Sequence, residues 1–200
     1  MSLADGGRGV LEGRATFTLA HRAERALFLL VWAVLARWTP PGMARWRALI
    51  LRAFGAEVGR GARVYGSARI WLPRNLTLGP GAVIGPRVTV YSMADIRLGA
   101  GAVVSQGAHL CCGSHDITSP GFELKTARIE IGPGAWVAAE AFVGPGVSMG
   151  EGAVLGARAV TFGDVPAWEV WAGNPAKRLK NRPREALPQV ARDAAPGANG

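Results

Sequence analysis

The sequence predicts a mainly β protein, a parallel β-helix of about five coils preceded by one or two α-helices and followed by a short C-terminal segment and tail. Two observations lead to this prediction. Glycine makes up 28 of 200 residues, twice the average share of ~7 %. Between Val58 and Leu155, apolar residues also recur in groups whose members are six positions apart. A period of six matches neither an amphipathic helix nor a half-buried strand, and a fixed repeat of this kind indicates a solenoid.

The first residue of each hexad is predicted to point inward and to stack on its equivalent in the next coil. Alanine is common at the fifth position, where a narrow corner is expected, and glycine recurs at the second and fourth positions. The resulting β-helix spans residues 58–166, with a projecting loop at 116–128 that lengthens the third coil. The inward residues are Val58, Val64, Ile70, Leu78, Ile84, Val90, Leu98, Val104, Leu110, Ile131, Val137, Val143, Met149, Leu155 and Thr161.

The flanks of the repeat differ from it in composition. Residues 14–57 are predicted to form a helical cap, with an uninterrupted apolar stretch at 26–36 that packs on the first coil or lies against a membrane surface. The segments 1–13 and 181–200 lack any apolar period and are predicted to be disordered. Residues 167–180 form a C-terminal segment between the last coil and the tail.

Composition excludes several classes of protein. The only two cysteines are adjacent, so no disulfide framework is expected, and no apolar run is long enough to span a bilayer. The net charge of +9 is concentrated in the two ends of the chain, without the basic face or motif of a nucleic-acid binder. We therefore expect no nucleic-acid partner. We expect a cytoplasmic protein, and association of this protein with the inner face of the membrane is a further possibility.

One column of the repeat suggests chemistry. The sixth hexad position on the third face is predicted to stack Asn75, Asp95, His115 and Ser148, the only continuously polar column. Asp95 would then lie beneath His115, where a carboxylate fixes the tautomer of an imidazole and raises its basicity. The loop at 116–128 leaves directly after His115. We therefore predict His115 as a general base, with Asp95 as its partner.

The remaining histidines and cysteines indicate no metal site. His109 lies on a neighbouring face and His21 in the N-terminal helix, so a third zinc ligand is missing from the coils. Cys111 and Cys112 stand among apolar residues and are predicted to be small core or corner residues.

Several motifs resemble those of a known family. The segment from Val104 to Asp116, with its Ser114-His115-Asp116 triplet, resembles the signature of colanic-acid-type acetyltransferases of bacterial exopolysaccharide synthesis. The segments 134–139, 142–146 and 172–177 match as well, and the likeness covers about residues 25–180. The wider group is the hexapeptide-repeat acyltransferases, and the resemblance implies a left-handed β-helix.

The resemblance also implies roles for individual residues. His115 matches the base that takes a proton from the acceptor hydroxyl while that oxygen attacks acetyl-CoA. Two alanines match backbone contacts, Ala139 to the oxyanion and Ala157 to the pantetheine arm. The cofactor phosphates would meet a basic cluster that consists of Lys177, Arg178 and Lys180. The acceptor would meet residues around His115, namely Asn75, Met93, Ser114 and Asp116. Such enzymes are homotrimers with active sites between subunits.

Two departures from the family leave alternatives open. Relatives carry a lysine near the end of the last coil, where this chain has Phe162 and Gly163, so one cofactor contact is in doubt. Distant sugar acetyltransferases carry a carboxylate at Met93, so we expect a different acceptor. An O-acetyltransferase acting on a sugar of an exopolysaccharide or glycolipid precursor is our main prediction. The alternatives are a small-molecule or antibiotic acetyltransferase and a non-catalytic scaffold.

Overall fold

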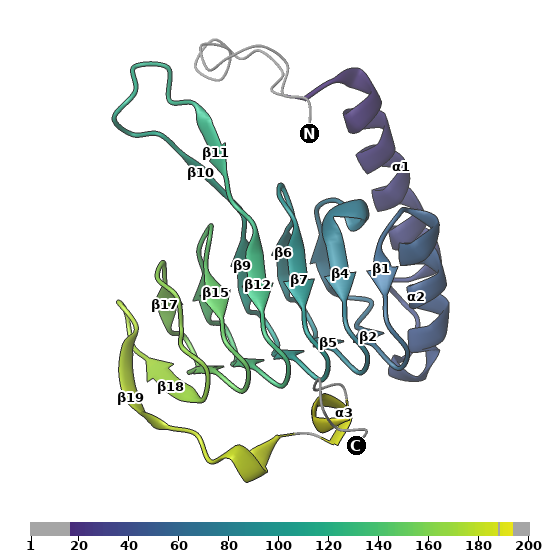
Figure 1. The fold of residues 1–200 in the computed structure, drawn as a ribbon. Helices are drawn as coiled ribbons and strands as arrows, with labels where there is room; N and C mark the ends of the chain where they lie inside the picture. Colours follow the sequence, from purple (N-terminus) through teal and green to yellow (C-terminus); the bar gives the residue numbers. More distant parts are fainter. Residues whose placement is uncertain (1–16, 188, 194–200) are drawn as a thin grey trace.

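Three parallel sheets enclose one core in the computed structural model, which describes residues 17–187 and 189–193 (Figure 1). Sheet A contains β1 (Glu57–Val58), β4 (Leu76–Leu78), β7 (Ile96–Leu98), β12 (Ile129–Ile131) and β15 (Ser148–Met149). Sheet B contains β2 (Arg63–Val64), β5 (Val83–Ile84), β8 (Val103–Val104), β13 (Trp136–Val137), β16 (Val154–Leu155), β18 (Glu169–Ala172) and the antiparallel β19 (Lys177–Asn181). Sheet C contains β3 (Arg69–Ile70), β6 (Thr89–Tyr91), β9 (His109–Cys111), β14 (Phe142–Val143) and β17 (Val160–Thr161).

The strand register confirms the hexad prediction for sheets B and C. Arg63 pairs with Val83, and Thr89 pairs with His109, as the predicted columns require. All the predicted inward residues are buried, from Val58 at 9 % exposure to Leu155 at 0 %. The coil count is slightly higher than five, because Val165 bridges Met149 and β18 adds a sixth strand to sheet B.

Glycine at the second hexad position is required by close contact between coils. A Cβ atom on Gly79 would lie 2.7 Å from the backbone nitrogen of Ala100 in the next coil. At the fourth position the backbone itself is left-handed, with φ of +68° at Gly81. Both positions therefore exclude larger side chains, for different reasons.

Two helices cover the first coil, α1 (Leu19–Leu35) and, after the 3₁₀ turn Pro41–Met43, α2 (Ala44–Ala53). Phe28, Trp32 and Ala36 recur every fourth residue and are buried against the coil, and the indole of Trp32 donates a hydrogen bond to the carbonyl of Gly66. This arrangement shows that the helices cap the β-helix (Figure 1). The rest of the α1 surface nevertheless leaves large apolar side chains exposed: Leu27, Leu29, Leu30, Val34 and Leu35.

Arg47 joins α2 to the rest of the cap. Its side chain is 1 % exposed, and its guanidinium donates to the Thr39 side chain and to the carbonyls of Pro40, Pro41 and Val64. A buried guanidinium is tolerated because its donors are satisfied in this way.

The C-terminal end differs from the prediction. We expected a disordered tail from residue 181, but residues 184–186 form a 3₁₀ turn and Gln189–Arg192 form α3, in which Ala191 is fully buried. Arg182 donates to the carbonyls of Gly134 and Gly152, which fastens this segment along the coils. This segment has too few apolar residues for its sequence to show a period that would predict ordered structure. The other segment predicted to be disordered, 1–13, lies outside the described residues.

Candidate active site

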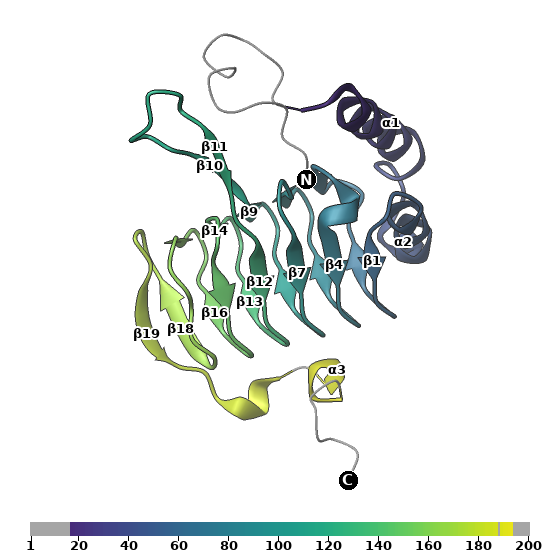
Figure 2. The same cartoon turned by 45° about the horizontal axis from the view of Figure 1, so that its top comes forward.

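An antiparallel hairpin projects from the third coil and carries His115 (Figure 2). Its strands are β10 (Gly113–His115) and β11 (Leu124–Thr126), and we call residues 113–126 the arm. The coil resumes beyond the arm, where the amide of Ala127 donates to the carbonyl of Cys112 over 3.0 Å. The arm begins earlier than the predicted loop at 116–128, so His115 belongs to the projecting hairpin and not to a coil.

The arm holds the imidazole of His115 in one orientation. Its Nδ1 lies 2.8 Å from the carbonyl oxygen of Phe122, and its ring is stacked on the Phe122 ring with centroids 4.4 Å apart. Because a carbonyl oxygen can only accept, Nδ1 must carry the proton in this contact. The other nitrogen, Nε2, then holds a free lone pair, which is the form that a general base requires.

The turn of the arm is organised by Asp116. Its carboxylate accepts hydrogen bonds from the amide and hydroxyl of Thr118 and forms an ion pair with Lys125 at 2.7 Å. Lys125 and Thr118 hold the pKa of Asp116 well below its ordinary value. Ser114 is exposed and precedes His115 on the same strand, so the two side chains leave opposite faces of the hairpin. Asp116 therefore has partners within the arm.

The predicted stacking of His115 on Asp95 is wrong. Ile129, not a residue of the arm, pairs with Ile96, and the Asp95 carboxylate forms an ion pair with Arg97 at 3.6 Å. The outward polar column of sheet A differs from the predicted one. Thr77 and Arg97 stand in it, two residues after the predicted Asn75 and Asp95, and Ser148 is the one predicted member that it keeps. It consists of Glu57, Thr77, Arg97, Glu130 and Ser148.

Met93 and Asn75 lie near the base of the arm. Met93 is 2 % exposed, and a Cβ atom on Gly113 would lie 2.7 Å from its sulfur and 3.0 Å from the ring of Tyr91. The side-chain amide of Asn75 donates to the carbonyl of Ser92 over 2.9 Å. Asn75 thus fixes the backbone that supports the arm, and Met93 packs beneath it.

The predicted cofactor residues follow a different corner of the prism, between sheets B and C. Ala139 and Ala157 occupy equivalent turn positions in successive coils, joined by a hydrogen bond from the Arg158 amide to the Ala139 carbonyl. Within the described part of the chain, neither the Ala139 nor the Ala157 amide donates a hydrogen bond. Both N–H groups therefore remain donors for a ligand.

The basic cluster lies on β19, at the C-terminal end of that corner. Lys177 and Lys180 are exposed, whereas the guanidinium of Arg178 donates to Glu169 and Asn181. A pocket of about 400 Å³ adjoins the cluster, and its lining includes Phe162 and Gly163, the residues that depart from the family. The ring of Phe162 is 69 % exposed there.

Other candidates are placed by the structure as well. His109 is half-buried, its Nε2 atom has no hydrogen-bond partner among the described residues, and burial lowers its pKa. Cys112 is fully buried, as predicted for a core residue, and burial raises its pKa to about 12. Among the residues that the structure describes, no three His, Cys, Asp or Glu side chains gather in a way that could hold a metal ion. Phe122 could not be identified from the sequence, because a single aromatic residue in an aperiodic insertion gives no signal.

Comparisons with known proteins agree with this architecture. No family model matches the chain. The chain is 43 % identical over 156 residues to the putative colanic acid biosynthesis acetyltransferase WcaF of Escherichia coli (strain K12), a match that covers 76 % of this chain and 86 % of that protein.

Solved structures share the fold at lower identity. A maltose O-acetyltransferase from Clostridium difficile 630 superposes with a TM-score of 0.76 at 20 % identity, covering 92 % of this chain and 100 % of that one. A galactoside acetyltransferase in complex with coenzyme A gives a TM-score of 0.75 at 18 % identity, over 88 % and 90 % of the two chains. With its left-handed parallel β-helix of hexapeptide repeats, the chain belongs to the family of colanic-acid-type acetyltransferases.

Proposed function

We propose that this acetyltransferase transfers the acetyl group of acetyl-CoA to a hydroxyl of a sugar in exopolysaccharide or glycolipid biosynthesis, with His115 as general base. The observation that carries the proposal is the contact of His115 Nδ1 with the Phe122 carbonyl, which leaves Nε2 free to accept a proton. The family supports the donor and the class of acceptor, since its named relative belongs to colanic acid biosynthesis.

The proposed reaction proceeds through a tetrahedral intermediate. Nε2 of His115 takes the proton of the sugar hydroxyl while that oxygen attacks the thioester carbonyl carbon. The developing oxyanion accepts a hydrogen bond from the Ala139 amide, which has no partner within the described residues. The intermediate then expels the CoA thiolate, which takes the proton back from the imidazolium. The products are the sugar ester and free CoA.

The cofactor is proposed to lie along the corner between sheets B and C. Its pantetheine arm would meet the Ala157 backbone, and its phosphates would meet Lys177 and Lys180 at the end of that corner. Arg178 already bonds Glu169 and contributes its charge to the same region.

We propose a homotrimer, in which a site shared between neighbouring copies would bring these groups together. His115 leaves the prism between sheets C and A, whereas Ala139 lies between sheets B and C. A site that needs both groups can be completed when the arm of one copy reaches the Ala139 corner of its neighbour. We therefore propose active sites between subunits. The test is subunit mixing: His115→Ala and Ala139→Pro chains, each inactive alone, regain activity together if the site is shared. Failure to regain activity in mixed oligomers places each site within one chain.

The outward face of α1 is proposed to touch the inner face of a membrane. Leu27, Leu30 and Val34 are 55, 62 and 56 % exposed on this face, and Trp38 is 72 % exposed just beyond the helix. Within the described residues, no helix has the length and apolar character needed to cross a bilayer. Flotation with anionic liposomes tests the contact. We expect a Leu30→Ser, Val34→Ser double variant to lose flotation; equal flotation of both chains contradicts it.

Thiol release from acetyl-CoA tests the enzymatic proposal. The chain would be incubated with a panel of sugars and lipid-linked glycans, beside His115→Ala and the matched arm variant Ile117→Ala, whose side chain is 84 % exposed. We expect His115→Ala to lower turnover by roughly 10²–10⁴-fold and Ile117→Ala to leave it unchanged. Turnover only with a small antibiotic acceptor, or a chain that neither binds acetyl-CoA nor releases thiol, would support the alternatives instead.

A further inference from the structure

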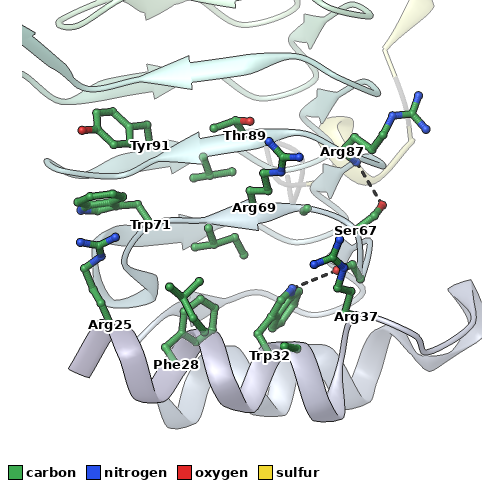
Figure 3. Close-up of a pocket in the computed structure, with 16 residues that line it drawn as sticks. Arg25, Phe28, Trp32, Arg37, Ser67, Arg69, Trp71, Arg87, Thr89 and Tyr91 are labelled. Carbon is green, nitrogen blue, oxygen red and sulfur yellow. Dashed lines mark hydrogen bonds between the residues drawn. The ribbon is translucent and has the colours of Figure 1, made fainter. Parts of the chain in front are cut away.

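A pocket of about 580 Å³ lies between α1 and the first two strands of sheet C, outside the groups assigned to acetyl transfer (Figure 3). One wall is the inward side of α1, and the other is formed by β3 and β6. The indole of Trp32, bonded to the Gly66 carbonyl, fixes one end of α1 to the coil. The pocket is therefore a feature of the cap and the first two coils.

The interior of the pocket is apolar and aromatic. Phe28, Trp32, Ile70 and Val90 are buried along its floor, and the rings of Trp71 and Tyr91 close one end, 4.8 Å apart. Leu29 and Ala33 of α1 continue this lining toward solvent. A lining of this kind suits a hydrocarbon chain.

The charged residues that line the pocket in the described part of the chain are all basic. They are Arg25, Arg37, Arg69 and Arg87, without any Asp or Glu among the described residues. Arg25 lies over the Trp71 ring, with its Cζ atom 3.1 Å from the ring centroid, and Figure 3 shows this pair below Tyr91. The ion pairs of the described residues include none of these four arginines.

Two buried donors lie at the aromatic end. Among the described residues, Arg25 Nε and Trp71 Nε1 are buried and have no hydrogen-bond partner. A buried donor without an acceptor is unfavourable, and one of these two belongs to the charged guanidinium of Arg25, so the pair indicates a site that an acceptor completes. An oxygen-rich anion supplies such an acceptor and compensates the charge.

We propose that this pocket binds a long-chain phosphate, with its phosphate at the Arg25–Trp71–Tyr91 end and its hydrocarbon chain along the floor between α1 and sheet C. Arg25, the basic residue at that end of the pocket in Figure 3, selects the phosphate, and the apolar floor selects the chain. Either a lipid phosphate that carries the acceptor sugar or a bilayer phospholipid offers this chemistry.

The position of the phosphate end favours the acceptor, an assignment that rests on the proposed function. The Tyr91 ring also contacts Gly113, the first residue of the arm, and His115 follows two residues later on the same strand. A sugar linked to a phosphate at Tyr91 would thus extend toward the arm. The pocket would hold the lipid end of the acceptor, and the sugar of the acceptor would lie within reach of His115 on the arm of the same or a neighbouring copy.

Calorimetric titration with dodecyl phosphate, below its micellar concentration, tests the pocket without any acetyl transfer. We expect saturable binding at one site per chain, and much weaker binding of dodecyl maltoside and of inorganic phosphate. Arg25→Gln should weaken dodecyl phosphate binding at least tenfold, and Ala33→Phe should block the chain. The matched control Arg45→Gln removes an exposed charge from α2 and should leave the affinity unchanged. Circular dichroism verifies the fold of each variant.

The outcomes below overturn the pocket, the acceptor assignment or the proposed reaction separately. A phosphate site in this pocket is excluded if the chain binds dodecyl phosphate and dodecyl maltoside with equal affinity. It is also excluded if neither Arg25→Gln nor Ala33→Phe changes the affinity for dodecyl phosphate. Displacement of dodecyl phosphate by phosphatidylglycerol vesicles assigns the site to bilayer lipid and overturns the acceptor assignment. His115→Ala should bind dodecyl phosphate normally, so binding without any acetyl transfer would reject the proposed reaction while leaving the pocket in place.

Discussion

The rings of His115 and Phe122 are stacked with an interplanar angle of 7°, and the same two residues are joined by the bond from Nδ1 to the carbonyl. Phe122 adopts a left-handed backbone conformation, with φ of +47°, to present both groups. The residue that orients the proposed base is therefore a neighbour on the arm.

Removal of the Phe122 ring should impair the base without deleting it. An aromatic pair contributes about 0.5–1.5 kcal/mol, so we expect Phe122→Ala to lower kcat by about two- to tenfold, whereas Phe122→Tyr keeps the stacking and the rate. Steady-state thiol release measures the rate, and ¹⁵N chemical shifts of the imidazole report the tautomer. An unchanged tautomer population and rate in Phe122→Ala would contradict this role.

The proposed oxyanion donor can be removed with little change to the backbone. Pro86 occupies in the second coil the turn position that Ala139 occupies in the fourth, and the next residues, Arg87 and Glu140, share φ values of +56° and +59°. Ala139→Pro therefore deletes one N–H in a turn that accepts proline. We expect a loss of roughly 10²–10³ in kcat. Gln106→Pro, at the equivalent position of the third coil, is the control and should retain its activity.

Asp95 is expected to contribute little to turnover. Its carboxylate is paired with Arg97 at the surface, at 54 and 56 % exposure, and exposed pairs contribute only ~0–1 kcal/mol. Asp95→Asn should leave kcat and its pH profile within twofold of the unmodified chain. A shift in the acidic limb of that profile would instead show that Asp95 reaches the base in the assembled enzyme.

Close contact between coils should make Gly79 intolerant of a methyl group. Gly79→Ala places a Cβ atom 2.7 Å from the next backbone, whereas Gly163→Ala has no atom within 4 Å. Overpacking typically costs ~1–3 kcal/mol, so thermal unfolding should shift down for the first variant only. Equal melting temperatures would mean that the coils can separate locally.

Acid should destabilise the fold through His109. Burial lowers the pKa of His109 in the native chain, while the unfolded imidazole titrates near ~6.5. As the pH falls through that value, the unfolded state binds a proton that the native state does not, so the free energy of unfolding decreases. Urea unfolding between about pH 7.5 and 5.5 should show a smaller decrease for His109→Phe. The buried His21, whose pKa is also lowered, contributes the remainder.

The periodic part of the fold could be predicted from the sequence, because each hexad makes the same contacts as the one below it. Val83 and His109 lie in the columns that the period assigns to them. The period fails at Gly113, where the chain leaves the coil and pairs with Thr126. His115 still falls at a regular six-residue interval from His109, so spacing alone places it on a coil.

Features that depend on three-dimensional neighbours could not be predicted. The stretch at 26–36 is apolar on all sides, and only the structure separates the buried Phe28 from the exposed Leu30. The pocket at Trp71 combines residues of α1, β3 and β6, and no local pattern links them. His115 is selected as a candidate base by the predicted polar column and the projecting loop, and by the resemblance; the register assumed for that column differs from the one in the structure.

The two ends of the β-helix differ from its middle in a way that limits self-assembly. Every internal strand has a neighbour on both sides, so a bare terminal coil would offer the same unpaired amides and carbonyls to another copy and allow growth into a filament. At one end α1 and α2 cover the first coil, and at the other β19 reverses direction and carries Lys177, Arg178 and Lys180 at the edge. These features oppose the end-to-end growth of copies through the first coil and through the outer edge of sheet B.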